Sequence, residues 1–385
     1  MSKLSYMEKL LDGVEVEWRA LRDVVKTITA PAKLKRESYR EAGQTPIIDQ
    51  GEKFITGYTD EDVKALPLGE YVIFGDHSEH IKYVDFSFIQ GADGLKILKS
   101  ISDNPKYVYY SFLNFYQKEL NYKRHWARAS ETLIPIPCPD NPEKSLAIQS
   151  EIVRILDKFT ALTAELTAEL NMRKKQYNYY RDKLLSFEEG EVEWKTLEDV
   201  AHFANGKGHE KDISEDGKYI VVNSKFISTD GLVAKYSDSQ ICPLFKDDIL
   251  LVMSDLPNGK ALSKTFIVDE DERYTLNQRI GGITVKDKSE ILPKFLHYYL
   301  DRTPQLLKHD NGVDQTNLRK GQILEVKVPI LPLQKQEHIV SILDKFDKLT
   351  KSLSEGLPRE IELRQKQYEY YRDLLLSFPK SDEAA

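Results

Sequence analysis

The sequence predicts an α+β protein in which two globular mixed α/β domains are joined by a pair of long antiparallel coiled-coil helices, in a pseudo-twofold, nearly circular arrangement. Three observations predict this fold. A stretch in the middle of the chain has the apolar spacing of a coiled-coil helix, a copy of that stretch lies near the C-terminus, and one ten-residue motif opens each half.

The first long helix is expected from about Ile148 to Phe187. Its apolar side chains recur in steps of four and three residues, which is the seam of a coiled coil and requires a partner helix. The seam consists of Ile148, Ile152, Ile155, Phe159, Leu162 and Leu166, followed by Tyr177, Tyr180, Leu184 and Phe187.

The expected partner is the C-terminal helix, which is a copy of the first. Residues 155–159 read I-L-D-K-F and return unchanged at 342–346, and residues 175–187 agree with 366–378 at eleven of thirteen positions. Its seam consists of Ile339, Ile342, Phe346, Leu349, Leu353, Tyr368, Tyr371, Leu375 and Phe378.

The duplication extends beyond the helices. The opening motif at 15–24 returns at 191–200 with seven of ten residues alike, and Pro-rich segments at 134–137 and 328–332 precede the two helices. Repeats of this length indicate a pseudo-twofold molecule. The segments between the repeated parts show no such similarity, so a duplicated frame is expected to hold two different inserts.

Short strands and one late helix are predicted in each insert. In the first insert we expect strands at 71–74 and 95–98 and a helix at 107–120. In the second we expect strands at 249–252, 265–268 and 280–285 and a helix at 295–307.

Two irregularities are expected in the long helices. Residues 163–170 repeat T-A-E-L in tandem, which is a stutter in a heptad helix, and Gly356 with Pro358 should interrupt the second helix at the matching place. The repeat is either length drift between duplicates or a spacer that sets a distance between the domains.

The expected domain organisation follows from these repeats. Residues 6–11 resemble 180–185 and read as the tail of a third helical copy, predicted to lie near the end of the C-terminal helix. The predicted parts are an N-terminal segment (1–13), a first domain (14–147), a central spacer helix (148–189), a second domain (190–333), a C-terminal spacer helix (334–378) and a tail (379–385).

Composition indicates a soluble cytoplasmic protein of two domains. Hydrophobic residues make up 41% and charged residues 30% of the 385 residues, no apolar run is long enough to span a membrane, and no signal peptide is evident. Cys138 and Cys242 lie in unrelated contexts, as expected in a reducing compartment. The net charge of −7 argues against nucleic-acid binding unless a local basic face or partner subunits supply the site.

The repeated helices, the E-V-E-W opening motifs and the tandem T-A-E-L resemble the DNA-specificity subunit of a type I restriction–modification enzyme, with type IC as the most similar branch. The resemblance spans nearly the whole chain. Softer similarities to target-recognition domains lie at 74–77, 91–94, 122–125 and 315–318.

This resemblance implies that each insert is a target-recognition domain for double-stranded DNA. It implies that the helices space these domains and dock two methyltransferase subunits, that a restriction/translocase subunit joins them, and that the chain itself is not an enzyme. A helix of forty residues spans about 60 Å and a turn of DNA about 34–36 Å. Two domains so separated can address two half-sites about one turn apart, with unread base pairs between them. The expected target is bipartite for this reason, and asymmetric because the two inserts differ in sequence.

No motif in the sequence predicts catalysis, a cofactor or a metal. Residues 140–143 lack the second proline and the aromatic ring of an adenine-methyltransferase loop and read as a turn that caps the following helix. Residues 206–208 and 258–261 lack parts of the nucleotide-binding fingerprints. His77 and His80 are spaced like metal ligands but have no second pair.

The candidate DNA contacts are basic, amide and aromatic residues that cluster in the inserts. Arg and Asn or Gln can read base edges in the major groove, and Lys mostly holds phosphates, although each residue is equally well explained as a solvated side chain. The candidates are His77, Lys82, Tyr122, Lys123, Arg124, His125 and Arg128 in the first insert, and Lys207, His209, Lys211, Lys225, Lys260, Gln278, Arg279, Gln315, Asn317 and Arg319 in the second.

The tyrosines of the long helices divide into two groups. Tyr177, Tyr180, Tyr368 and Tyr371 continue the seam, whereas Tyr179 and Tyr370 fall off it. The second pair, with Arg181 and Arg372, is the predicted contact surface for partner subunits.

Two other functions remain open at this stage. A coiled-coil scaffold or adaptor that binds only proteins fits the helices and the acidic charge, but rarely needs two large unlike inserts. A stand-alone nuclease or methyltransferase is disfavoured by the missing motifs.

Overall fold

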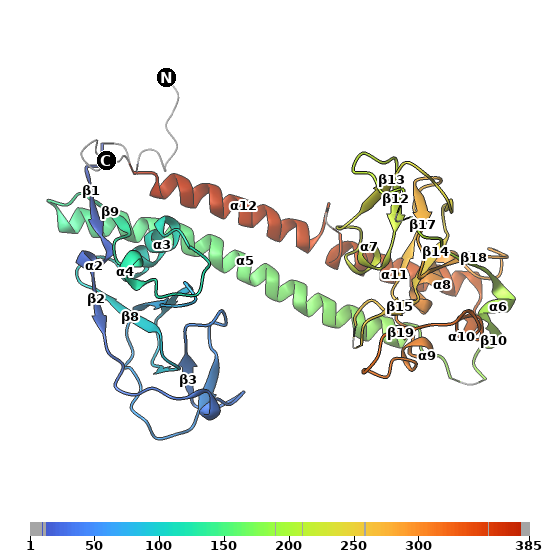
Figure 1. The fold of residues 1–385 in the computed structure, drawn as a ribbon, viewed down its shortest axis with the longest axis horizontal. Helices are drawn as coiled ribbons and strands as arrows, with labels where there is room; N and C mark the ends of the chain where they lie inside the picture. The colour runs from blue at the N-terminus through green and yellow to red at the C-terminus, as the bar shows by residue number, and fades with distance from the viewer. Residues whose placement is uncertain are drawn as a thin grey trace. The chain divides into compact units, whose positions relative to one another are not determined.

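The computed structural model describes residues 10, 13–188, 190–209, 211–257, 259–352 and 354–378. The chain divides into two compact units (Figure 1). Unit 1 contains the chain up to Glu165 and from Ile361 onwards, and unit 2 contains Leu166–Glu360.

Unit 1 is built on a four-stranded antiparallel sheet in the order β2-β8-β5-β6. A three-stranded sheet, β4-β3-β7, adjoins it, with β3 parallel to β7, and β1 pairs with β9. The strands are β1 Val16–Ala20, β2 Val25–Ile28, β3 Thr45–Ile48, β4 Gly57–Thr59, β5 Tyr71–Gly75, β6 Ile81–Val84, β7 Ile89–Gln90, β8 Leu95–Ser100 and β9 Leu133–Pro137. The helices are α2 Leu21–Val24, η1 Arg36–Ser38, α3 Pro105–Phe115, α4 Trp126–Ala129 and α5 Pro142–Leu184.

Unit 2 repeats the order of these three sheets and adds a short two-stranded sheet, β15-β19. Its four-stranded sheet has the order β11-β18-β14-β16, its three-stranded sheet has the order β13-β12-β17 with β12 parallel to β17, and β10 pairs with β20. The strands are β10 Glu193–Thr196, β11 Ala201–Asn205, β12 Tyr219–Val222, β13 Lys235–Ser237, β14 Ile249–Val252, β15 Ser254–Asp255, β16 Thr265–Ile267, β17 Tyr274–Leu276, β18 Ile280–Val285, β19 Thr316–Asn317 and β20 Lys327–Ile330. The helices are α6 Leu197–Val200, α7 Ser224–Ser228, α8 Pro293–Leu300, α9 Pro304–Leu307, α10 Lys320–Leu324 and α11 Leu333–Thr350. The last helix, α12 Leu357–Leu376, begins in unit 2 and belongs to unit 1 from Ile361 onwards.

The two inserts therefore share a topology although their sequences differ, and the predicted order of strands followed by a late helix is confirmed in both. The shared topology is accompanied by a short sequence match in the late helices. α3 begins P-K-Y-V-Y-Y at Pro105, and α8 begins P-K-F-L-H-Y at Pro293. In both helices the proline occupies the first turn, where its missing N–H is not needed.

The frame contacts are duplicated atom for atom. In unit 1 the carboxylate of Asp157 accepts hydrogen bonds from Tyr110 Oη at 2.7 Å and Lys106 Nζ at 2.8 Å. In unit 2 Asp344 accepts from Tyr298 Oη and Lys294 Nζ, both at 2.7 Å. Both aspartates belong to the repeated I-L-D-K-F, so this motif clamps the late helix of each insert to the frame.

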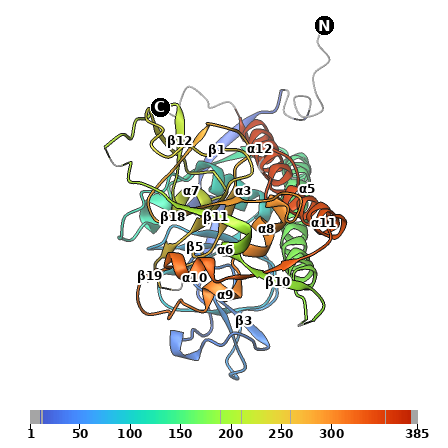
Figure 2. The same ribbon diagram turned by 90° about the vertical axis from the view of Figure 1, so that its right-hand side faces the viewer.

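A buried glutamine completes each clamp. Gln149 and Gln336 are fully buried. The side-chain oxygen of Gln149 accepts from the backbone N–H of Asn104, the N-cap residue of α3, at 2.8 Å. The side-chain oxygen of Gln336 accepts in the same way from Leu292, the N-cap residue of α8, at 2.8 Å. The side-chain amide of Gln149 donates to Asp103 Oδ1, and that of Gln336 donates to the carbonyl oxygen of Leu331. Both buried amides therefore have hydrogen-bond partners. Figure 2 shows α8 and α11 side by side, where this contact is made.

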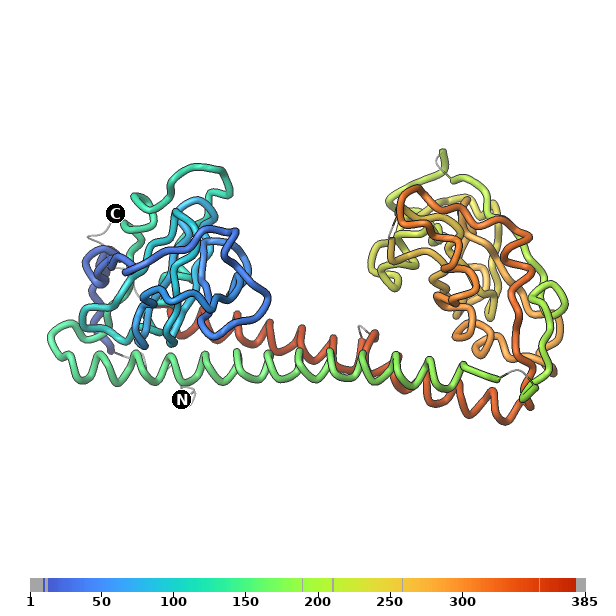
Figure 3. Tube along the Cα trace, turned by 90° about the horizontal axis from the view of Figure 1, so that it is seen from below, coloured from blue at the N-terminus to red at the C-terminus, as the bar shows by residue number. Residues whose placement is uncertain are grey.

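The predicted long helices are confirmed, with shifted ends. α5 is unbroken (Figure 3), begins six residues before the expected start because Asn141 caps it, and passes from unit 1 into unit 2. The second helix is divided into α11 and α12, and the predicted break at Gly356 is present, with φ at +84°. Leu353 lies outside the described residues.

The seam pairs antiparallel helices within each unit. In unit 1 the ring of Phe159 stacks on Tyr371, and Ile152 shares a buried cluster with Leu375, so residue numbers run in opposite directions. In unit 2 Tyr177 and Tyr180 lie against Phe346. Leu162 and Tyr180 remain exposed over 36% and 38% of their surfaces, so the seam is only partly covered at these two positions.

Two predicted helices are shorter than expected. The helix expected at 107–120 ends at Phe115, because the buried carboxylate of Glu79 accepts the backbone N–H of Glu119 and Leu120 and holds the chain in a loop. The helix expected at 295–307 is split into α8 and α9 by Pro304, which cannot continue a helix. The predicted strands are confirmed to within two residues at their ends.

The predicted position of the N-terminal segment lies mostly outside the described residues. Leu10 packs against the cluster that contains Leu375, Leu376 and Phe378. The remainder of this expectation stays a prediction.

Candidate functional site

The candidate residues of each unit gather at one edge of its four-stranded sheet. At this edge β5 ends opposite the start of β8, with Gly75 paired to Leu95, and in unit 2 β14 ends opposite the start of β18, with Val252 paired to Ile280. β2 and β11 end at the same edge. We call it the reading edge. In unit 1 it consists of loops 29–36, 75–80 and 117–126. In unit 2 it consists of the described residues of four loops, namely 206–209 with 211, 253–257 with 259–260, 277–279 and 308–319.

The reading edge of unit 1 brings His77 and Tyr122 together. Their rings stack with centroids 5.3 Å apart, and His77 Nδ1 lies 3.1 Å from the carbonyl oxygen of Lys123. Tyr122 is nevertheless exposed over 90% of its surface. The stack fixes an aromatic ring that faces solvent, which is the arrangement of a platform for a nucleobase.

Asp76 and Glu79 hold the loop that carries these residues. Asp76 Oδ1 accepts from the backbone N–H of His125 and Trp126, at 3.0 and 2.8 Å. Burial alone would raise the pKa of Glu79, but hydrogen bonds from Tyr116 Oη and from the N–H of Glu119 and Leu120 lower it overall. Both loop anchors are thus carboxylates that accept backbone N–H groups.

Two of the predicted contacts in unit 1 are buried. His125 lies inside the loop, with Nε2 2.9 Å from the carbonyl oxygen of Asn121 and Nδ1 3.4 Å from Glu79. Lys82 donates from Nζ to the carbonyl oxygens of Asp49 and Lys53, and burial lowers the pKa of its ammonium. In this structure both side chains support the loops from within.

The basic residues of this loop differ in their pairing. Glu119 forms ion pairs with Lys123 at 2.5 Å and Arg128 at 2.6 Å, and these partners, Lys123 first, lower the pKa of its carboxyl group. Arg124 is exposed between them. Any phosphate contact by Lys123 or Arg128 therefore has to compete with Glu119.

The reading edge of unit 2 joins clusters that are far apart in the sequence. The carbonyl oxygen of Lys207 accepts from the backbone N–H of Gln278 at 3.0 Å, and Lys207 forms an isolated β-bridge with Asn277. His209 is buried between the carbonyl oxygen of Lys207 and Thr275 Oγ1. Two basic and amide segments seventy residues apart thus form one surface.

The third segment of unit 2 lies against the same turn. Arg279 has φ at +67°, its carbonyl oxygen accepts from the N–H of Met253, and the carbonyl oxygen of Met253 accepts from the N–H of Leu318. Gln315 Nε2 donates to Ser254 Oγ at 2.8 Å. The exposed candidates that this network brings together are Lys207, Gln278, Arg279, Gln315, Asn317 and Arg319.

The remaining candidates of unit 2 lie farther from this network. Lys211 follows the Lys207 loop, and Lys225 lies in α7, just after β12, whose Val222 accepts from the N–H of Asn277. Lys260 lies in the loop after β15, and its carbonyl oxygen accepts from Arg302. All three side chains are exposed.

Sequence reasoning missed the first loop of unit 1. Lys33, Lys35 and Arg36 follow β2 and occupy the place that the Lys207 loop occupies after β11. Lys33 forms an isolated parallel β-bridge with Gln90, the last residue of β7. Lys207 does the same with Asn277, just after β17. Aligning the two opening motifs and counting forward would have indicated this loop.

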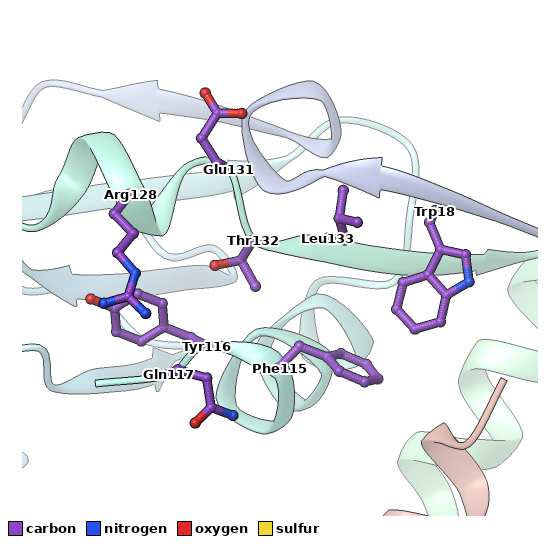
Figure 4. Close-up of a pocket in the computed structure, with 8 residues that line it drawn as sticks. All are labelled: Trp18, Phe115, Tyr116, Gln117, Arg128, Glu131, Thr132 and Leu133. Carbon is purple, nitrogen blue, oxygen red and sulfur yellow. The ribbon is translucent and has the colours of Figure 1, made fainter. Parts of the chain in front are cut away.

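The frame carries two corresponding pockets. In unit 1 a hollow of about 300 Å³ lies between Trp18, Phe115 and Arg128, whose side chains Figure 4 shows around it. In unit 2 a hollow of about 620 Å³ includes the equivalent Trp194, together with Tyr299 and Arg181. Trp18 and Trp194 come from the two copies of the opening motif, so the duplication has produced a related surface in each unit.

The predicted partner contacts also occur as a matched pair. Tyr179 and Tyr370 are exposed over 60% and 64% of their surfaces. Arg181 and Arg372 each lie 5.9 Å from a seam tyrosine ring, of Tyr177 and Tyr368. Each arginine also pairs with the aspartate that follows it.

The described ranges contain neither a cluster of metal ligands nor a helix suited to a membrane. There, no group of three His, Cys, Asp or Glu residues could hold a metal ion. No helix in that part of the chain is long and apolar enough to cross a membrane.

Comparison with known proteins identifies relatives of the whole chain. A family model described as type I restriction modification DNA specificity domain matches residues 13–173 and 189–363. The specificity subunit of the type I restriction enzyme EcoR124I/EcoR124II from Escherichia coli is 44% identical, and the match covers 99% of each chain. The specificity subunit of EcoprrI, also from Escherichia coli, is 32% identical over 92% of this chain and 93% of the relative.

Two solved structures share the fold. The S subunit of a type I restriction-modification system from M. genitalium is 17% identical, with a TM-score of 0.62 over 98% of this chain and 100% of that chain. A chain from a structural study of complex assembly and conformational transition of the type I R-M system is 14% identical, with a TM-score of 0.53 over 94% and 97%.

Proposed function

Since the chain belongs to the family of type I restriction–modification DNA-specificity subunits, we propose that its two units read the two halves of a bipartite, asymmetric DNA target in the cytoplasm. The chain itself is non-catalytic. It supplies the recognition, and the chemistry belongs to the other subunits of the complex.

The observation that carries this proposal is the shared reading edge. Two domains of one topology place exposed Arg, Lys and amide side chains on loops at the same sheet edge, although those loops differ in sequence. Arg279 and Gln278, for example, offer groups that can bind guanine and adenine edges. Exposed basic groups on one local surface can bind phosphates in spite of a net charge of −7.

We further propose that the duplicated frame docks two methyltransferase subunits, and that restriction/translocase subunits join through them. The support is the repetition of Tyr179 with Arg181 as Tyr370 with Arg372, and of the Trp18 pocket as the Trp194 pocket. A surface that occurs twice in one chain fits two copies of one partner. Exposed Tyr and Arg are the residue types enriched in interfaces.

A binding assay with the methyltransferase subunits present tests DNA recognition. The complex should retain a duplex that contains the cognate target, found by selection from random sequence, in preference to a scrambled duplex. Equal binding to both duplexes would leave a protein-binding scaffold as the better description.

An exchange of inserts tests the modular arrangement. Replacing residues 191–328 by the corresponding segment of another family member should change one half of the selected target and leave the other half and the gap unchanged. Changes in both halves would contradict reading by separate units.

A further inference from the structure

Each reading edge presents an aliphatic side chain to solvent. Leu120 is exposed over 85% of its surface and Val313 over 76%, although both belong to loops that are otherwise polar. Exposing a large aliphatic side chain has no stabilising effect in the free protein, and covering it would be favourable. Isolated exposed apolar residues are common, so the argument depends on their positions.

The two residues occupy equivalent places in the two units. In unit 1 the backbone N–H of His125 donates to the carbonyl oxygen of Asp76, the residue directly after β5. In unit 2 the backbone N–H of Leu318 donates to the carbonyl oxygen of Met253, the residue directly after β14. Leu120 lies five residues before His125, and Val313 lies five residues before Leu318. The surrounding loop sequences differ, so the aliphatic character recurs where little else does.

Hydrogen bonds fix the backbone at both positions. Leu120 has φ at +56°, a region that a leucine rarely adopts, and the buried Glu79 maintains it by accepting the N–H of Leu120 at 2.8 Å. In unit 2 Asn311 Oδ1 accepts the N–H of Val313 at 2.9 Å, next to Gly312 with φ at +69°. An uncommon backbone conformation fixed by a polar anchor indicates that the exposed side chain is positioned for a purpose.

The charge around these residues favours DNA as the group that covers them. Residues 117–128 contain Lys118, Lys123, Arg124 and Arg128 against the single acidic Glu119. Around Val313, the basic Lys308, Arg319 and Lys320 outnumber Asp310 and Asp314. Phosphates attract such a surface, whereas an apolar protein partner does not require it. Proteins that distort DNA insert aliphatic side chains of this kind between bases.

We propose that Leu120 and Val313 are two apolar wedges, one for each half of the target, that enter the base stack beside the nucleotide to be methylated. Methyltransferases act on a base that has been rotated out of the duplex, which leaves a gap in the stack. An aliphatic side chain can fill this gap without leaving a hydrogen bond unmade. The proposal rests on the proposed DNA recognition and assigns these two residues a specific part in it.

The test uses the complex with methyltransferase subunits and duplexes that carry a fluorescent base analogue at the modified position, 2-aminopurine for adenine or pyrrolo-cytosine for cytosine. Leu120→Asn removes the apolar group and keeps the backbone conformation, which asparagine tolerates. Val313→Thr replaces a methyl group by a hydroxyl at constant shape. The controls are Leu68→Asn, in the loop that precedes β5 at the opposite end of that strand, and Val233→Thr, in the loop before β13.

With the parent chain, binding should increase the fluorescence of the analogue in both halves. Leu120→Asn should abolish the increase in one half only, and Val313→Thr in the other, each with about a tenfold loss of affinity for the target. Affinity for scrambled DNA and the behaviour of both controls should match the parent.

Two results would overturn the wedge proposal while leaving DNA recognition intact. One is a normal fluorescence increase and affinity for both variants. The other is an affinity loss that replacement of thymine by deoxyuridine in the target reproduces, since that would indicate contact with a thymine methyl group. A parent complex that does not prefer the target duplex would instead contradict the proposed function itself.

Discussion

The clamp between the repeated I-L-D-K-F and the late helix of each insert allows a quantitative prediction. In unit 1, Tyr110 Oη donates to Asp157 Oδ1 at 2.7 Å, and burial together with Asp157 raises the pKa of the tyrosine, so its hydroxyl remains a donor. A hydrogen bond to a charged group contributes about 1.5–3 kcal/mol. The ion pair of Asp157 with Lys106 is about one-third exposed and adds about 0.2–1 kcal/mol.

A double-mutant cycle of Tyr110→Phe and Asp157→Ala isolates the first of these contributions. The change in helix propensity at residue 157 occurs in both arms of the cycle and cancels. We expect a coupling free energy of about 1.5–3 kcal/mol. For a unit of this size, each kcal/mol corresponds to a shift of about 2–4 °C in Tm.

The same cycle in unit 2 provides the matched comparison. Tyr298 Oη lies 2.7 Å from Asp344 and also 3.1 Å from Asp347, so Tyr298 can redirect its hydrogen bond when Asp344 is removed. The coupling of Tyr298→Phe with Asp344→Ala should therefore be smaller than the coupling in unit 1. Native-state hydrogen exchange, followed separately for α3 and α8, measures both values in the full chain. A unit 1 coupling below about 0.5 kcal/mol, or an equal coupling in unit 2, would refute the assignment of the clamp.

Three further predictions concern recognition, spacing and pH. Arg124→Ala and Arg279→Ala should each weaken target binding by about 1–3 kcal/mol if the arginines contact guanine, and a gel-shift titration with unchanged affinity for both would remove them from the site. Deleting Thr167 to Leu170 removes about 6 Å of helix, which corresponds to about one to two base pairs at about 3.4 Å each. Selection of binding sites should therefore return the same half-sites with a gap that is shorter by this amount, and an unchanged gap would contradict the spacer hypothesis. Burial lowers the pKa of His297, so the folded protein favours the neutral ring and loses stability as the pH falls below the unfolded value of about 6.5. Tm measured between about pH 7.5 and 5.5 should decrease less for His297→Asn than for the parent, and parallel curves would contradict this contribution.

The frame could be predicted from the sequence because the chain contains two copies of it, and each copy can be compared with the other. Most seam positions of α5, among them Ile152, Phe159 and Tyr177, have a copy in α11 or α12, and a pattern that occurs twice in one chain supports itself. The break at Gly356 was also visible, since glycine and proline act locally on the backbone. The same local rule applied to Pro304 would have divided the helix expected at 295–307.

The end of α3 could not be predicted by local rules. Residues 116–120 contain neither glycine nor proline, and the loop forms because the carboxylate of Glu79, some forty residues earlier, accepts the backbone N–H of Glu119 and Leu120. A tertiary contact of this kind overrides helix propensity. The buried state of Lys82, His125 and His209 has a similar origin, since their partners are mostly backbone carbonyl oxygens whose positions only the fold determines.

The common topology of the inserts changes how their differences should be interpreted. Because the strands and the reading edge are the same in both units, differences in recognition have to arise from the loop side chains. Unit 1 offers an exposed Tyr122 stacked on His77, with Arg124 beside it, whereas unit 2 offers the amides of Gln278 and Gln315 around Arg279. Arginine favours guanine and amides favour adenine, so two unlike loop sets on like scaffolds lead to two unlike half-sites. Under the proposed function, the asymmetry of the target would thus be a property of a few loop residues, and a fold built twice could acquire a new target without any change in its frame.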